Sequence, residues 1–100
     1  MNLETINKRL IEISQELREK LTNYSKLQNE YELRKAGLMM DEETKGFANQ
    51  ALRDAYILKV LSEEDIYTKY NLTHNEIKLL YIEKEILIEV SRNLRELNHD

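Results

Sequence analysis

Apolar residues recur with a period of seven over the first third of the chain. One set occupies every seventh position: Leu3, Leu10, Leu17, Tyr24, Tyr31 and Leu38. A second set follows three positions after each of the first five: Ile6, Ile13, Lys20, Leu27 and Arg34. These are the a and d positions of a heptad repeat, which keeps one seam of a helix against its partner. The pattern predicts a long helix over about 2–36 whose seam is covered by other helices.

Two charged residues, Lys20 and Arg34, interrupt this seam. Their long side chains allow two arrangements. Each one either lies along the seam with its charged head in water, or fixes the register by pairing with an acid on a facing helix. The sequence leaves both arrangements open.

Both glycines of the chain lie between residues 35 and 47, in KAGLMMDEETKGF. Gly37 can adopt the left-handed conformation that ends many helices. We therefore expect the first helix to end near Ala36 and the chain to turn over 37–47. The adjacent acids Asp41, Glu42 and Glu43 are typical of a solvated cluster at a helix start rather than of a metal site.

The same turn carries three large apolar side chains beside its acids, namely Met39, Met40 and Phe47. Methionine adapts its shape to varied surfaces, and exposed apolar patches often mark binding sites. These residues are our candidate surface for a protein partner. The alternative is that they close the end of a helix bundle.

A short phrase occurs twice in the second half: Leu-Ser-x-x-Asp-Ile at 61–66 and Leu-Thr-x-x-Glu-Ile at 72–77. Each has the form of a capping box with a hydrophobic staple, with Ser62 and Thr73 as the capping residues. Asn71 is suited to close the turn before the second box. The return arm is therefore predicted to break twice, giving helices over about 48–61, 63–70 and 74–97.

The last segment is apolar on more than one side, so it needs neighbours on two sides. An unbroken arm over 47–97 would measure about 75 Å against about 50 Å for the first helix. The excess would leave several apolar side chains in water. We therefore expect a bend and also self-association, with a dimer favoured, through Tyr81, Ile82, Ile86, Ile88 and Val90.

Composition supports a single all-α domain over residues 1–100. Charged residues make up 34% of the chain, with two glycines and no proline, so the breakers that β-rich folds need for their turns are missing. The predicted architecture is a long heptad helix packed antiparallel against a broken helical arm, in a hairpin or a three- to four-helix bundle. Cysteine is absent, which excludes disulfides and thiolate metal sites and suits a cytoplasmic protein.

Helix, short helix and a turn near Asn71 also have the spacing of a helix-turn-helix. The residues that would then face DNA are Thr73, His74, Asn75 and Lys78. Two features oppose this alternative. Bulky Tyr67 occupies the position of close helix contact, and residues 62–82 carry four acids against two bases. Because DNA affinity rests on neutralising phosphates, the net charge of −4 weighs against nucleic acid as a partner.

Catalytic signatures are missing from the sequence. The two histidines lie at 74 and 99, no nucleophile turn is present, and no glycine-rich loop is available to hold phosphate. The longest uninterrupted apolar run is LLYI, far short of a membrane span. We expect a chain that is not an enzyme, takes no cofactor or metal and does not enter a membrane.

The stretch KGFANQALRDAYILKVLSEEDIY, residues 45–67, is similar to a segment of small helical accessory proteins of tailed bacteriophages. The matching residues, in order, are Asn49, Arg53, Ala55, Glu63, Glu64 and Tyr67. Gln50 and Ala51 depart from the family, where Ala-Glu is typical, and Asn71-Leu72-Thr73 is expected to interrupt what is usually a continuous helix. The resemblance implies a non-enzymatic helical hairpin in the host cytoplasm, acting on a replication, recombination or host-defence component.

A secreted helical hairpin of the type VII class is a second alternative. Tyr81-x-x-x-Glu85 has the form of the export signal of that class, but the Trp-x-Gly turn is missing because the chain has no tryptophan. The interpretation that fits most of the sequence is a self-associating helical protein that binds a protein partner.

Overall fold

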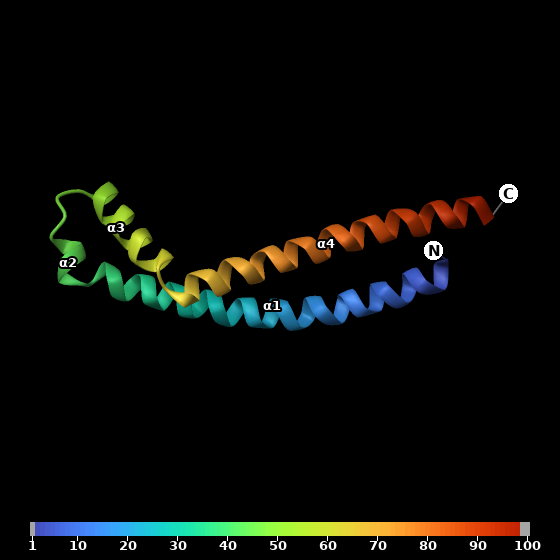
Figure 1. Cartoon of the computed structure of the whole chain (residues 1–100), viewed down its shortest axis with the longest axis horizontal. Coiled ribbons are helices and arrows are strands. Elements are labelled where there is room, and N and C mark those ends of the chain that lie inside the picture. The colour runs from blue at the N-terminus through green and yellow to red at the C-terminus, as the bar shows by residue number, and fades with distance from the viewer. Residues whose placement is uncertain (1, 99–100) are drawn as a thin grey trace. The chain divides into compact units, whose positions relative to one another are not determined.

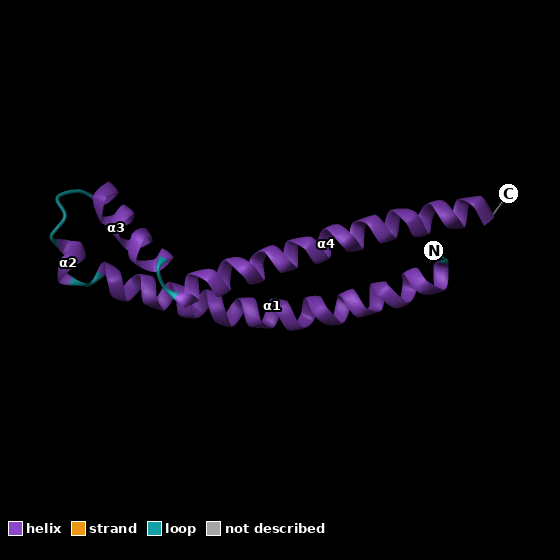
Figure 2. Cartoon of the chain, viewed as in Figure 1, coloured by secondary structure: helices purple, strands orange, loops and turns teal. Residues whose placement is uncertain are grey.

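The computed structural model describes residues 2–98, which form helices and loops and contain no strand (Figure 2). The helices are α1 (Leu3–Met39), α2 (Glu42–Lys45), α3 (Gln50–Ser62) and α4 (Asp65–Asn98). The chain runs out along α1, turns through α2 and returns through α3 and α4, with α1 antiparallel to α4 (Figure 1). The all-α hairpin with a broken return arm is the predicted fold.

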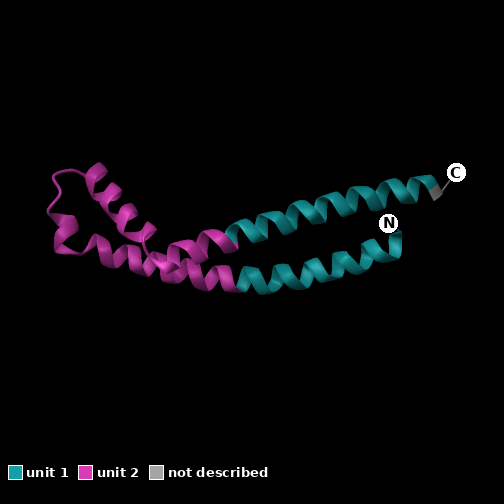
Figure 3. Cartoon of the chain, in the orientation of Figure 1, with its two compact units in different colours: residues 1–22, 74–100 teal, residues 23–73 magenta. Residues whose placement is uncertain are grey.

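The chain divides into two compact units, each built from both arms of the hairpin (Figure 3). Unit 1 pairs the start of α1, up to residue 22, with α4 from residue 74 onward. Unit 2 comprises residues 23–73 and therefore holds the end of α1, the short α2, all of α3 and the first turns of α4.

In unit 1 the predicted heptad seam is buried. Ile6 and Ile13 are fully inaccessible to solvent, and Leu17 is nearly so. From α4, Ile77, Leu80 and Leu87 are buried as well, with Ser91 beside them. Burying an isoleucine or leucine side chain stabilises a fold by roughly 1.5–3 kcal/mol. This seam therefore supplies most of the driving force for the pairing of the two helices.

The helix α4 has a heptad of its own that sequence analysis missed. Residues with low exposure alternate at spacings of four and three along it: Ile66, Tyr70, Thr73, Ile77, Leu80, Lys84, Leu87, Ser91 and Leu94. Another side of the same helix carries Leu79, Ile82 and Ile86, which are exposed. The seam contains Thr73, Lys84 and Ser91, and these polar members obscured its period of seven.

Unit 2 is built around a small core of Leu38, Ile57 and Leu61, with Tyr31 and Tyr67 packed against it. The predicted end of the first helix near Ala36 is wrong by three residues. The helix continues through Gly37 to Met39, and none of the described residues has a positive φ. Extending the helix carries Leu38 into this core, which compensates for the low helix propensity of glycine.

The first predicted break in the return arm is confirmed, although its chemistry differs from the prediction. α3 ends at Ser62 and α4 begins at Asp65. The hydroxyl of Ser62 donates to the carbonyl of Lys59, 2.8 Å away, instead of capping the next helix. Backbone N–H groups of Glu63 and Glu64 donate three residues back, so a tight turn separates the helices.

The second predicted break, and with it the separate helices over 63–70 and 74–97, is wrong, because α4 is continuous through residues 71–73. Asn71 does not close a turn, and its side-chain amide donates to the carbonyl of Tyr67, one turn earlier in the same helix. Thr73 is buried in the seam instead of capping a helix end. Continuity keeps the buried heptad unbroken, which outweighs the local capping signal.

Candidate interaction surfaces

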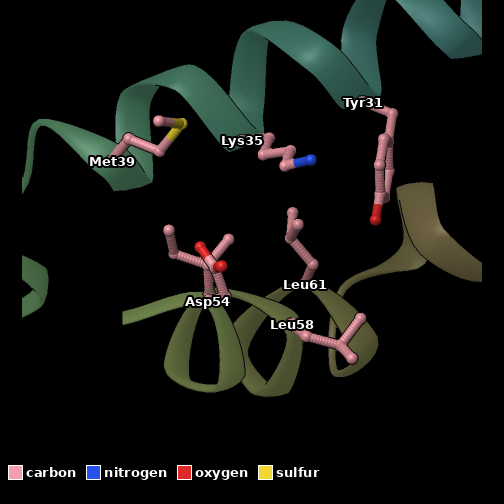
Figure 4. A pocket seen from close by; sticks show the side chains of 7 residues that line it. Tyr31, Lys35, Met39, Asp54, Leu58 and Leu61 are labelled. Carbon is pink, nitrogen blue, oxygen red and sulfur yellow. The ribbon is translucent and has the colours of Figure 1, made fainter. Parts of the chain in front are cut away.

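A groove in unit 2 separates the end of α1 from α3 (Figure 4). Its volume is about 410 Å³. The α1 wall consists of Tyr31, Lys35 and Met39, and the α3 wall consists of Asp54, Ile57, Leu58 and Leu61. The spacings, four on α1 and three or four on α3, place each set on one face of its helix. Ile57 and Leu61 form the buried floor, whereas Leu58 and Met39 are about half exposed.

The groove carries one charge of each sign, on opposite walls. Lys35 extends from α1 and Asp54 from α3 (Figure 4). The side-chain amide of Gln50 donates to the Asp54 carboxylate at 2.7 Å, which holds that carboxylate on the α3 wall. Apart from the Tyr31 hydroxyl the rest of the lining is apolar, so a ligand would meet an apolar floor with one charge on each wall (Figure 4).

An ion pair elsewhere in unit 2 joins α1 to the turn before α4. The guanidinium of Arg34 meets the Glu64 carboxylate at 2.7 Å, and Nε donates to both carboxylate oxygens. Hydrogen bonding from Arg34 lowers the pKa of Glu64, and the same bond raises the pKa of Arg34. Of the two arrangements open for this seam residue, pairing with a facing acid is the one that forms.

The three apolar residues of the tip lie in different surroundings. Met39 lines the groove, and Met40 is largely exposed. Phe47 is half-buried with its ring centroid 5.0 Å from that of Tyr56. The Tyr56 hydroxyl donates to Glu43 at 2.6 Å, and this bond is the main reason that the pKa of Tyr56 is raised. Phe47 thus closes the loop onto α3, whereas Met39 and Met40 remain accessible.

A second apolar surface runs along α4 within unit 1. Its members are Leu79, Ile82, Ile86 and Val90, which we call the outer stripe. The first three are exposed by 66%, 46% and 57%, and Val90 is partly buried. Successive spacings of three, four and four place all four residues on one side of the helix. This amount of exposed aliphatic surface on one helix is typical of a binding surface.

The five residues predicted for self-association do not share one face. Ile82, Ile86 and Val90 belong to the outer stripe. Tyr81 and Ile88, which are also exposed, occupy the other flank of the buried seam, seven residues apart. Leu79 was not among the predicted residues, although it lies seven positions before Ile86 and is the most exposed member of the stripe.

Ion pairs line the edge of the outer stripe that faces α1. Arg9 Nε and Nη2 donate to the two oxygens of Glu83 at 2.7 Å each, and Nη1 also reaches Glu16 and Glu12. Hydrogen bonding from Arg9 lowers the pKa of Glu83, and the bond to Glu83 raises the pKa of Arg9.

Two turns away along the same edge of α4, Glu76 pairs with the Lys20 ammonium. Lys20 is therefore the second seam residue whose charge is paired with an acid on the facing helix. Glu76 and Glu83 are the two carboxylates on this side of α4, and α1 supplies a cation to each. Each α4 carboxylate on this edge thus has a cation within reach, although Arg9 is shared between Glu83 and two carboxylates of α1, Glu12 and Glu16.

The geometry that would support a DNA-reading helix does not form. A helix-turn-helix needs a turn near Asn71, and α4 runs straight through that position. Thr73, one of the residues expected at DNA, is buried in the seam, whereas His74, Asn75 and Lys78 are exposed on α4. The predicted recognition surface is therefore not assembled.

Among the described residues, no group of three or more His, Cys, Asp or Glu side chains is arranged to hold a metal ion. Within the same range, no helix has the length and apolar character needed to span a bilayer. Comparison of the chain with protein-family models, with curated proteins and with solved structures gave no match. The surfaces themselves are thus the basis for a functional hypothesis.

Sequence analysis singled out Met39 but missed the rest of the groove. Lys35, Asp54 and Leu58 carry no motif. The available signal was the spacing of Tyr31, Lys35 and Met39 by four residues, which continues one face of α1 beyond the predicted helix end. A helix assumed to stop at Ala36 cannot present that face.

Proposed function

We propose that this chain is a non-enzymatic helical protein that binds a helix of a protein partner in the groove of unit 2. The observation that carries the proposal is the groove itself: two helical walls with an apolar floor and one charge on each wall. Recognition of an amphipathic helix in a groove is a recurring mode of protein interaction, in which apolar anchors at i, i+3 or i+4, and i+7 enter the groove.

The dimensions support a short helical ligand. Tyr31 and Met39, at the two ends of the α1 wall, are eight positions apart, which corresponds to about 12 Å, or roughly two helical turns. Two turns present two or three anchors. Met39 at one end suits a range of anchor shapes, because its unbranched side chain adapts to the contacting surface.

The two charges of the groove indicate which charges a bound helix would carry on its flanks. Lys35 favours an acidic residue on one flank of the bound helix, and Asp54 favours a basic residue on the other flank. Charges at the rim of an interface contribute mainly to specificity and orientation. The partner helix is thus expected to have an apolar stripe with an acid along one edge and a base along the other.

A display experiment with random peptides tests the proposal whatever the identity of the partner. The peptides are selected on the wild-type chain alone and then tested on Leu58→Glu, which places a carboxylate at the half-exposed rim. Leu33→Glu is the matched control, since Leu33 is more exposed and lies on α1 outside the groove. Both variants are checked for unchanged helicity by circular dichroism.

Selected peptides are expected to be amphipathic and to bind wild type and Leu33→Glu equally. Their affinity for Leu58→Glu is expected to fall roughly tenfold or more, because the new carboxylate lies beside the apolar floor of the groove. In a charge exchange, Lys35→Glu is expected to prefer peptides whose acidic flank is replaced by lysine. Equal binding of the peptides to all four chains contradicts the proposal.

The similarity of residues 45–67 to phage accessory proteins extends the proposal to a class of partner, namely a component of replication, recombination or host defence. The tagged wild-type chain and its Leu58→Glu variant are compared by quantitative mass spectrometry of co-purified host proteins. A partner of the groove is retained by wild type and by Leu33→Glu and lost from Leu58→Glu. A protein captured by all three chains is not bound through the groove.

A further inference from the structure

We propose that the outer stripe of α4 binds the same stripe of a second copy of this chain, with the two α4 helices antiparallel. The stripe consists of Leu79, Ile82, Ile86 and Val90, lies entirely within unit 1, and is separate from the groove of unit 2 (Figure 3). The proposal therefore stands or falls independently of the partner helix proposed above.

Spacing within the stripe identifies a second copy as the occupant. A two-fold contact is self-complementary: if one residue meets another, the reverse contact also occurs. A two-fold axis that passes between the two α4 helices, at the level of residues 84 and 85, sets Leu79 opposite Val90 and brings Ile82 to within one residue, or about 1.5 Å along the helix, of the level of Ile86. Every apolar residue of one stripe then meets an apolar residue of the other. A parallel two-fold pair would instead set each residue opposite its own copy, with Lys78 beside Lys78 and Glu89 beside Glu89, and repulsion between these like charges disfavours it.

Charges at the two edges favour the same arrangement. Along the edge facing α1, both α4 carboxylates already have a cation partner within their own chain, Glu83 with Arg9 and Glu76 with Lys20, which lowers their repulsion toward a second copy. On the opposite edge, the two-fold places Lys78 of one copy within one helical turn of Glu89 of the other, and the pair occurs twice. Glu89 also contacts Arg92 of its own helix at 3.1 Å, which leaves one carboxylate oxygen for Lys78.

Sedimentation equilibrium over a range of concentrations measures the association directly. Wild type is expected to show a monomer–dimer equilibrium. Ile86→Glu is expected to raise the dissociation constant about 100-fold or more, because the two-fold places the substitution in the interface twice. The matched control is Ile11→Glu, a similarly exposed isoleucine on α1, whose dissociation constant is expected to be unchanged.

Ile86 is more than half exposed, so the glutamate is compatible with the folded unit. Leu79→Glu, at the most exposed member of the stripe, gives a second variant should Ile86→Glu lose helicity. A wild-type chain that remains monomeric at concentrations of several hundred micromolar overturns the proposal. So does a dimer that both variants leave intact.

Because the chain has no native cysteine, single cysteines can be introduced to measure the relative orientation of the two α4 helices in the dimer. A Leu79→Cys chain and a tagged Val90→Cys chain are mixed and treated with a short bis-maleimide. The antiparallel dimer is expected to give mainly the mixed cross-linked product. Predominance of the two homodimeric products indicates parallel stripes and overturns the proposal, and so does cross-linking at neither position in a sample that sediments as a dimer.

Discussion

Arg9 on α1 and Glu83 on α4, 74 positions apart in the sequence, are joined by two parallel hydrogen bonds of 2.7 Å. The guanidinium and the carboxylate meet edge to edge, the arrangement in which this pair is most directional. If one helix moved past the other by a whole heptad, an apolar seam with a period of seven would stay buried. The same movement would separate the Arg9 guanidinium from the Glu83 carboxylate. Arg9 and Glu83 thus select one register for the two helices of unit 1.

Reversing the charge of Glu83 is expected to lower the stability of unit 1. Glu83→Lys places a cation beside Arg9, so its melting temperature should fall below that of Glu83→Gln, which in turn should fall below that of wild type. Glu85→Lys makes the same charge change two residues later, at an exposed position. Thermal unfolding followed by circular dichroism compares the four chains. If Glu85→Lys lowered the melting temperature as much as Glu83→Lys does, the effect would come from the change in net charge and not from loss of the Arg9–Glu83 pair.

The same pair predicts a dependence on pH. Because the bonded guanidinium lowers the pKa of Glu83 in the folded chain, the pair contributes fully above the pKa of an unfolded-chain glutamate. The contribution is lost as the pH falls through the lowered pKa. The difference in melting temperature between wild type and Glu83→Gln should therefore be present at pH 7 and shrink below about pH 4. A difference that persists at pH 2 contradicts this account.

Three tyrosines of unit 2 form a stack that is expected to open at high pH. The ring of Tyr70 lies 5.1 Å from that of Tyr24 and 5.0 Å from that of Tyr31, both nearly parallel. The hydrogen bond between the Tyr24 and Tyr70 hydroxyls, whose oxygens are 3.0 Å apart, is the main cause that raises the pKa of Tyr70 to about 12.

A raised tyrosine pKa contributes stability below the unfolded-chain value of about 10 that is lost as the pH rises through about 12. Tyr70→Phe keeps the ring but removes the ionisable hydroxyl, so its stability should fall less steeply over this window. Melting temperatures at pH 9, 10 and 11 provide the measurement. Parallel curves for the two proteins would show that Tyr70 does not titrate as described.

Two neighbouring isoleucines of α1 offer a direct test of the seam. Ile13 is fully buried and Ile11 is 62% exposed. Ile13→Ala is expected to cost about 2–5 kcal/mol in the free energy of unfolding, since it removes a side chain and leaves a cavity. Ile11→Ala is expected to change it by less than about 0.5 kcal/mol. Urea denaturation measures both, and similar costs at the two positions would contradict the seam.

Proline at residue 72 distinguishes a continuous α4 from a helix-turn-helix. Leu72 is exposed, so its replacement removes little packing. In a helix interior proline costs about 3 kcal/mol or more, because it removes a hydrogen bond and clashes with the preceding turn. Leu72→Pro should therefore be strongly destabilised relative to Leu72→Ala. Equal stability of the two variants would indicate a turn at this point.

The fold could be predicted because burial of the apolar seam makes the largest contribution to stability, and the residues of that seam recur at a regular spacing. Ile6, Ile13 and Leu17 indicate a seam by spacing alone, and the absence of proline leaves the helices few places to stop. The pairing of Lys20 with an acid was one of two open arrangements. Helix ends were less predictable, because Gly37 and Thr73 carry local signals for a stop and a start that burial of their neighbours overrides.

The candidate surfaces depend on which apolar side chains remain exposed, and a single sequence does not determine this. On α4, Leu79 and Leu80 are equally apolar, yet Leu80 is buried and Leu79 is exposed. Leu80 belongs to the buried heptad of α4 and Leu79 does not, and the polar members Thr73, Lys84 and Ser91 hide that heptad in the sequence. In the groove, Asp54 and Leu58 become neighbours of Met39 only after α3 has docked on Leu38.

The most direct test of the hairpin uses its native side chains. A carbodiimide joins a lysine amine to a carboxylate only when the two are in contact, and Lys20 pairs with Glu76 in the structure. An equimolar mixture of ¹⁴N- and ¹⁵N-labelled chains is cross-linked, digested and analysed by mass spectrometry. The account predicts a Lys20–Glu76 cross-link between peptides of the same isotope. Absence of that cross-link, or its appearance mainly between ¹⁴N and ¹⁵N peptides, would contradict an antiparallel pairing of α1 and α4 within one chain.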